Sequence, residues 1–167
     1  MIVLGIDPGS AITGYAVLDV VDAKKRPELI VASAIKTSKE LDGHHRLRVL
    51  YKNMLKVVKE YSPHVMVMER LFFGTNAKTI IKVGEARGVT LLAAADKDLP
   101  VFEHTALEAK MVLTGYGRSK KKDVQLAVKD YFGLDEIIKP DDASDAVAIA
   151  LCFLNKNKDF EGFMDFG

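Results

Sequence analysis

The sequence has one cysteine among its 167 residues, and this scarcity excludes two kinds of protein. A single thiol can form no internal disulfide framework, and it cannot supply a cysteine-based zinc site. Cys152 lies within the apolar run 148–154, where a small buried thiol is the expected state. We therefore expect this thiol to serve packing rather than chemistry.

Long apolar runs and an excess of charge of either sign are also missing. No stretch reaches about 18 uninterrupted apolar residues, so no membrane span is expected. The first residues lack the basic start and apolar segment of a signal peptide, which favours a cytoplasmic protein. The 24 basic and 23 acidic side chains give a net charge of +1. This excludes a uniformly basic coat for nucleic acid and leaves a segregated basic patch open.

The composition that remains is that of one globular domain. Apolar residues make up 49% of the chain and charged residues 28%, which excludes a disordered or fibrous protein. A chain of this length is typical of a single domain with one proper core. We expect this domain to span residues 1–156 and to be followed by a flexible, acidic and aromatic tail at 157–167.

The hydrophobic pattern changes its period along the chain. Three β-rich segments joined by short turns predict an antiparallel meander, at residues 2–6, 13–20 and 29–35. Two further strands are expected at 65–68 and 100–102, and helices at 45–61, 76–95, 105–113, 121–132 and 141–154. This order predicts an α/β fold with a five-stranded mixed sheet, a meander followed by parallel strands, and helices on both faces.

Four carboxylates fall at the ends of these elements. Asp7 and Glu69 end the first and fourth strands, and Asp142 and Asp145 lie three residues apart in the first turn of the last helix. Because ligands of open α/β sheets bind at the carboxyl ends of strands, these side chains could converge. Mg²⁺ binds a few carboxylates with substrate phosphate, and two such ions about 4 Å apart hold a phosphodiester for in-line attack. Each acid alone would also fit a turn, a cap or a surface ion pair.

Three segments together resemble the RuvC family of Holliday-junction resolvases. They are GIDPGSAITGYAVL (5–18), MERLFFGTNAKTIIKVGEARGV (68–89) and DASDAVAIA (142–150), which keep the family's order and similar spacing. The resemblance covers about residues 2–154. It implies an RNase H-like fold and a homodimeric endonuclease that cuts two symmetric strands of a four-way DNA junction in recombination and repair.

The resemblance also implies a site, a cofactor and partners. It assigns the catalytic and metal-binding positions to Asp7, Glu69, Asp142 and Asp145, with two Mg²⁺ ions per site and Mn²⁺ as a possible substitute. The expected products carry a 5′-phosphate and a 3′-hydroxyl. The family's usual partners are the RuvA and RuvB proteins of branch migration.

A basic segment accompanies the acids. Residues 110–129 have six basic side chains and one acidic side chain, a net charge of +5. Such a stripe binds phosphates, although a solvated lysine-rich helix start is the plainer alternative. The candidates for DNA contact are Lys110, Arg118, Lys120, Lys121 and Lys122. The resemblance assigns Lys110 and Lys121 to the scissile region, and our hypothesis is that Lys121 balances charge on the phosphate.

Two aromatic residues and two glycines complete the candidates. Phe72 and Phe73 lead from a strand into a polar loop, where one could be core and the other could stack on an unpaired base. The resemblance favours Phe72 for stacking. Gly84 and Gly88 lie on one face of the helix 76–95 and would allow another backbone to approach closely. The resemblance places the dimer contact on this helix, and packing against the chain's own sheet is the alternative.

His44 and His45 look like a metal-binding pair. Adjacent residues of a helix point about 100° apart, so we expect the two rings not to share a metal and to lie at the surface near a helix start.

Three other functions stay open. GIDPGS also resembles the phosphate loop of actin-like and hexokinase-like ATPases, but these need about twice this length. An RNase H-like nuclease acting on RNA fits the same elements, although the match over 76–88 speaks against it. A junction-binding module without catalysis is disfavoured because all four acids are present.

Overall fold

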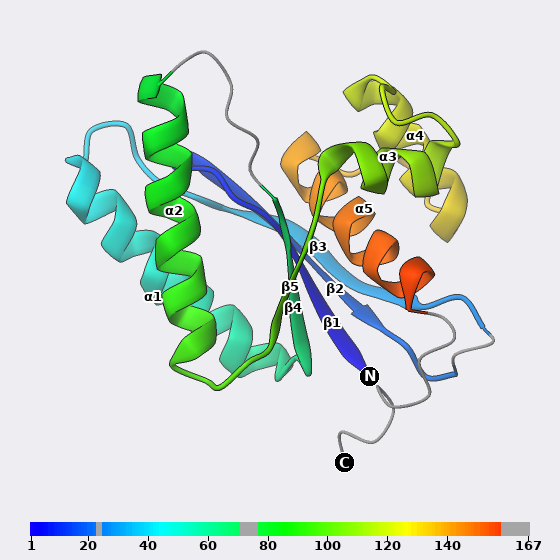
Figure 1. The fold of residues 1–167 in the computed structure, drawn as a ribbon, viewed down its shortest axis with the longest axis horizontal. Helices are drawn as coiled ribbons and strands as arrows, with labels where there is room; N and C mark the ends of the chain where they lie inside the picture. The colour runs from blue at the N-terminus through cyan, green and yellow to red at the C-terminus, as the bar shows by residue number, and fades with distance from the viewer. Residues whose placement is uncertain (23–24, 71–76, 158–167) are drawn as a thin grey trace.

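A five-stranded sheet forms the centre of the computed structural model, which describes residues 1–22, 25–70 and 77–157 (Figure 1). The strands are β1 (Ile2–Asp7), β2 (Ile12–Asp19), β3 (Glu28–Lys36), β4 (Val65–Glu69) and β5 (Val101–His104). Their order in the sheet is β3-β2-β1-β4-β5. β1, β2 and β3 pair antiparallel, whereas β4 runs parallel to β1 and β5 runs parallel to β4. The predicted meander followed by parallel strands is confirmed.

Helices cover both faces of the sheet, as predicted. They are α1 (Gly43–Tyr61), α2 (Ala77–Ala95), α3 (Ala106–Thr114), α4 (Lys121–Phe132) and α5 (Asp141–Lys156). Figure 1 shows α1 and α2 on one side of the sheet and α3, α4 and α5 on the other. Each expected helix is present with its ends within about two residues.

The strands of the sheet supply side chains to two cores. Val3 of β1 packs in the core with α3, α4 and α5, whereas Leu4 and Ile6 pack in the core with α1 and α2. The apolar residues 65–68 of β4 divide between the two cores in the same alternating way. β1 and β4 are therefore buried on both faces, which explains why they read as unbroken apolar runs.

The first turns of α5 press directly on the backbone of β1 and β2. A Cβ atom on Gly5 would lie closer than 3.0 Å to the carbonyl oxygen of Ala146, and a Cβ on Gly14 would meet that of Asp142 in the same way. Real Cβ atoms essentially never show such separations, so both strand positions need glycine. This contact fixes how closely the start of α5 approaches the sheet near the end of β1.

Three predictions concerned the cysteine, membrane-spanning segments and the C-terminal tail. Cys152 is free and buried, and burial raises the pKa of its thiol to about 11, which keeps it protonated. No helix in the ranges given above is both long and apolar enough to cross a membrane. Residues 158–167 lie outside the described part, so the division into a domain and a tail stays a prediction.

The contact of α5 with β1 predicts a stability cost for Gly5→Ala. The added methyl group would overpack against α5, and overpacking costs about 1–3 kcal/mol. Chemical denaturation followed by circular dichroism measures the loss. Gly43→Ala is the control, because its Cβ position meets no atom within 4 Å in the described part of the chain outside its own helix backbone. Equal stability of the two variants would contradict the close approach.

Candidate active site

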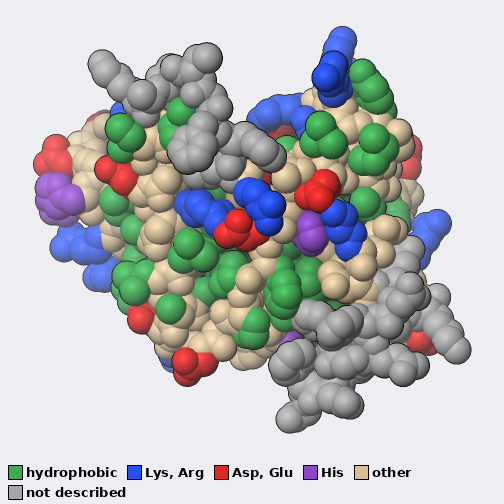
Figure 2. Space-filling view, viewed as in Figure 1, with side chains coloured by type: hydrophobic (Ala, Val, Ile, Leu, Met, Phe, Trp, Pro, Cys, Tyr) green, Lys and Arg blue, Asp and Glu red, His purple; other side chains and the backbone are tan. Residues whose placement is uncertain are grey.

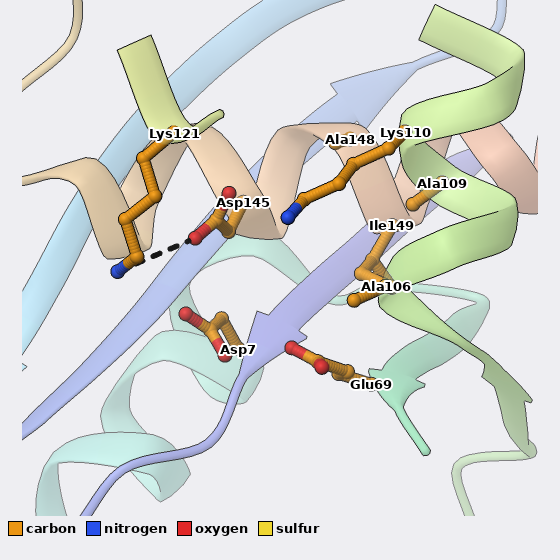
Figure 3. A pocket seen from close by; sticks show the side chains of 9 residues that line it. All are labelled: Asp7, Glu69, Ala106, Ala109, Lys110, Lys121, Asp145, Ala148 and Ile149. Carbon is orange, nitrogen blue, oxygen red and sulfur yellow. Dashed lines mark ion pairs between the residues drawn. The ribbon is translucent and has the colours of Figure 1, made fainter. Parts of the chain in front are cut away.

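Three carboxylates from three different elements meet at the carboxyl end of the central strands. Asp7 is the last residue of β1, and Glu69 is the last residue of the parallel neighbour β4, one position beyond the Ile6–Met68 pair. Asp145 comes from the start of α5, which lies over this end of the sheet. The three side chains line a cavity of about 210 Å³ (Figure 3).

The rest of the cavity wall comes from α3, α4 and α5. Lys110 of α3 and Lys121 of α4 reach into it from two sides. The remaining wall is made of small and apolar side chains, namely Ala106, Ala109, Ala148 and Ile149. The cavity therefore combines three acids and two lysines with walls that leave room for a ligand.

The crowding of these acids changes their protonation. Burial, together with the nearby charges of Glu69 and Asp145 and a hydrogen bond to Glu69, raises the pKa of Asp7 to about 9. Burial also raises the pKa of Asp145 to about 6, although Lys121 opposes the shift. At neutral pH and without a cation, Asp7 therefore carries a proton. The two lysines do not fully compensate the buried acids, and a divalent cation would add positive charge beside Asp7.

Asp142 lies at the edge of this group. Its side chain is half-buried and does not line the cavity, while its backbone carbonyl packs against Gly14. Its charge still contributes to the raised pKa of Asp7, as the smallest of the causes. The structure thus brings Asp7, Glu69 and Asp145 together and leaves Asp142 beside them.

Lys121 is held at the rim of the cavity by a residue that the sequence analysis did not single out. Its Nζ lies 2.7 Å from Oδ2 of Asp141 and 3.9 Å from Oδ2 of Asp145. The hydrogen bond to Asp141 raises the pKa of Lys121, and the same bond lowers the pKa of Asp141. Asp141 directly precedes the candidate Asp142 at the helix start, and this position is the sequence signal that could have identified Asp141.

The other basic candidates lie outside the cavity. Arg118, Lys120 and Lys122 are exposed and do not line it. The backbone N–H of Lys120 donates to Oδ2 of Asp123 at the start of α4. Phe72 and Phe73 lie outside the described residues, so their roles stay predictions.

Gly84 and Gly88 face away from the chain's own sheet. Among the described residues, and apart from the backbone of α2 itself, no atom lies within 4 Å of the Cβ position of either glycine. Ile81 and Leu92 fall on the same stripe of α2 by their spacing and are 61% and 54% exposed. Packing on the sheet therefore does not explain the two glycines, and α2 presents a bare apolar stripe.

The structure does not support the angular argument that kept His44 and His45 from sharing a metal, and the absence of a metal there stays a prediction. Their rings lie 4.1 Å apart between centroids, and ligand atoms of Asp42, His44 and His45 all lie within 4.8 Å of one another. The directions of the Cα–Cβ bonds do not fix where the ring nitrogens end, because each ring turns about two further bonds. The pair does lie at the surface near the start of α1, as expected.

Comparison with known proteins identifies the family. The family model described as "Crossover junction endodeoxyribonuclease RuvC" matches residues 3–153. The chain belongs to the RuvC family.

Relatives and solved structures agree with this assignment over nearly the whole chain. The RuvC of Desulforamulus reducens is 44% identical over 162 residues, which cover 97% of this chain and 98% of the relative. That of Thermosipho melanesiensis is 49% identical and covers 91% and 96%. The structure of T. thermophilus RuvC in complex with Holliday junction substrate is 34% identical, with a TM-score of 0.82 and coverage of 91% and 92%.

A more distant structure shows the fold alone. The yeast mitochondrial Holliday junction resolvase Ydc2 is 15% identical, with a TM-score of 0.61 over 95% of this chain and 83% of the other. Membership of RuvC makes the chain a divalent-metal-dependent endodeoxyribonuclease and gives it the RNase H-like fold. This membership disfavours the actin-like or hexokinase-like ATPase and the junction-binding module without catalysis.

The raised pKa of Asp7 predicts how Asp7→Asn changes stability with pH. In the metal-free wild type, the folded pKa near 9 lies above the ordinary value of 3.8. The stability contributed by this group is complete below pH 4 and is lost as pH rises towards 9. Asn does not ionise, so in EDTA the variant should lose less stability than wild type between pH 6 and 9. Each kcal/mol relieved should raise the melting temperature by roughly 2–4 °C.

Thermal melts across this pH range provide the measurement. Asp130→Asn, which changes an exposed carboxylate of α4, should follow the wild-type pH dependence. Parallel curves for wild type and Asp7→Asn would show that Asp7 ionises as an ordinary surface acid.

Proposed function

We propose that this RuvC protein resolves four-way DNA junctions by hydrolysing symmetric phosphodiesters at the cavity lined by Asp7, Glu69 and Asp145. The observation that carries the proposal is the convergence of three carboxylates and two lysines on one cavity. Carboxylates suit a hard divalent cation, and lysines suit a phosphate. The related T. thermophilus structure, which contains a Holliday junction, supports the same substrate.

Mg²⁺ is the cofactor that the donor set fits, with Mn²⁺ as a substitute. The acids supply oxygen ligands only, and burial with like charges leaves Asp7 protonated until a cation compensates. Two ions would be held by Asp7, Glu69 and Asp145, together with Asp142 at the edge. When bound, the metal supplies charge that activates an attacking water and stabilises the departing oxygen.

The chain's own residues orient the phosphodiester. Lys110 and Lys121 extend into the cavity from two helices, so their ammonium groups can hold phosphate oxygens on either side. Lys121, fixed by Asp141, balances the charge that develops on the phosphate during attack. The small side chains of Ala106 and Ala109 leave space for a sugar–phosphate backbone. Breaking the bond to the 3′ oxygen leaves a 5′-phosphate and a 3′-hydroxyl, which can be ligated during recombination and repair.

DNA beyond the scissile bond would contact the exposed basic side chains and the aromatic pair. These proposed contacts are Arg118, Lys120, Lys122, Phe72 and Phe73. A sequence match to RuvC also supports RuvA and RuvB as partners in branch migration.

The protein works as a homodimer in this proposal. A four-way junction has two symmetric cleavage points, and a twofold dimer offers two equivalent sites. The bare stripe of Ile81, Gly84, Gly88 and Leu92 on α2 supports this helix as the contact, since glycines allow two helices to approach closely.

Removal of a metal ligand should abolish cutting and spare binding. Glu69→Gln should cut a labelled junction at least about 100-fold more slowly than wild type, because it removes a direct ligand. Gel analysis with Mg²⁺ or EDTA, and with a matched linear duplex, measures cutting; fluorescence anisotropy in EDTA measures binding. Glu136→Gln, at an exposed position, should cut like wild type.

Three results would count against the proposal. They are wild-type cutting by Glu69→Gln, cutting in EDTA, or equal cutting of junction and linear duplex.

Interruption of the bare stripe should separate the protomers. Gly84→Glu meets open space within its own chain, so the fold should persist, while a carboxylate within an apolar contact should give a monomer. Light scattering coupled to gel filtration reports the mass, and circular dichroism reports folding. Gly43→Glu, also in open space but on α1, should stay dimeric. A dimeric Gly84→Glu would place the contact elsewhere.

A further inference from the structure

Arg87 of α2 bonds to the backbone of the proposed metal ligand Glu69. Its Nη1 donates to the carbonyl oxygen of Glu69 at 2.9 Å, and its Nη2 pairs with Oε1 of Glu103 on β5. The side chain of Arg87 is 15% exposed, so most of it is shielded from water. One rigid group thus joins a helix, the end of β4 and the edge strand.

The same end of β4 is held a second time from β5. The backbone N–H of Arg70 donates to the carbonyl oxygen of His104 at 2.7 Å. The Nε of Arg70 also lies 3.5 Å from Oε2 of Glu103, so Glu103 bridges two arginines. Basic and acidic side chains gather across the middle of the face shown in Figure 2.

These bonds hold the end of β4 beyond the last residue that pairs with β1. The register of β1 with β4 ends at Ile6 and Met68, one residue before Glu69. The direction in which the Glu69 carboxylate enters the cavity therefore depends on what fixes its own peptide. The bond from Arg87 does this from the side of α2, and the pairing with β5 does so from the edge.

We propose that Arg87 is a positioning residue for Glu69 and thereby sets the affinity of the site for divalent metal. Glu103 holds the guanidinium so that its fork meets the carbonyl and the carboxylate together. A lysine keeps the charge but lacks this planar fork. The inference rests on the proposed function, in which Glu69 is a metal ligand. Groups that orient ligands typically change metal affinity or activity by 10–100-fold.

A plain alternative is that Arg87 only docks α2 on the sheet. Against it, α2 already has buried contacts of its own through Ala86, Ala93 and Ala94. Shielded ion pairs also contribute little net stability compared with apolar packing. A docking role alone would change stability and leave the metal affinity as it is, so the two roles differ in what they alter.

The test compares Arg87→Lys and Arg87→Gln with wild type. Calorimetric titration with Mn²⁺ should show a dissociation constant 10–100-fold higher for Arg87→Gln, with a smaller rise for Arg87→Lys. The Mg²⁺ concentration for half-maximal single-turnover cutting should rise in parallel, and junction binding in EDTA should stay within about twofold. Because Asp42, His44 and His45 could also take Mn²⁺, every titration uses a His45→Gln background.

Arg26→Lys is the matched control. Arg26 also donates from Nη1 to a backbone carbonyl, that of Tyr131 at 3.2 Å, but no cavity residue is involved. Its Mn²⁺ affinity and metal dependence should equal those of wild type. Unchanged Mn²⁺ affinity in both Arg87 variants, with or without a lower melting temperature, would overturn the proposal.

Two further variants allow for an Arg87→Gln protein that does not fold and separate the positioning role from the proposed function. If Arg87→Gln does not fold, Arg87→Gln with Glu103→Gln removes both charges, and Arg87→Lys alone still reports the metal affinity. Glu69→Gln separates the two hypotheses. If it binds Mn²⁺ and cuts like wild type, the proposed function fails. If it loses both while the Arg87 variants keep both, only the positioning role fails.

Discussion

The structure depends on the contact of α5 with the backbones of β1 and β2. Gly5 and Gly14 lack the Cβ atoms that would hold the helix away, so the carbonyls of Ala146 and Asp142 sit where side chains would otherwise stand. The helix start is therefore fixed at the height of Asp7, and Asp145 faces the same cavity as the two strand-end acids. A wider spacing would leave Asp7 and Glu69 as neighbours at the strand ends and take Asp145 away from them.

The same closeness creates an electrostatic problem. Burial and the charges of the neighbouring acids together raise the pKa of Asp7, so the metal-free protein favours a proton on it. Lys121 relieves part of the repulsion on Asp145, while Asp141 keeps that lysine at the rim. A divalent cation held by these acids would favour the ionised form of Asp7, so its binding would release a proton.

Much of this could be predicted from the sequence, because its signals are local. The change from β-rich runs to helical spacing predicted every element, and strand ends predicted that Asp7 and Glu69 would be neighbours. Contacts between residues far apart in the sequence could not be predicted, because no spacing rule pairs Arg87 with the carbonyl of Glu69. Both Asp142 and Asp145 were candidates from the start of α5, and only the packing of the Asp142 carbonyl on Gly14 reveals that Asp142 lies at the edge of the cavity. The prediction for His44 and His45 relied on the directions of their Cα–Cβ bonds, which do not determine where the ring nitrogens lie.

The distribution of the acids over the chain has a consequence for its synthesis. Asp7 and Glu69 belong to strands made early, whereas Asp145 lies on α5, the last element in chain order. β1 also needs α5 to cover one of its faces. A growing polypeptide therefore has no complete set of acids until α5 has been made and has packed on the sheet. In the proposed function, the site therefore has no cutting activity before α5 is in place.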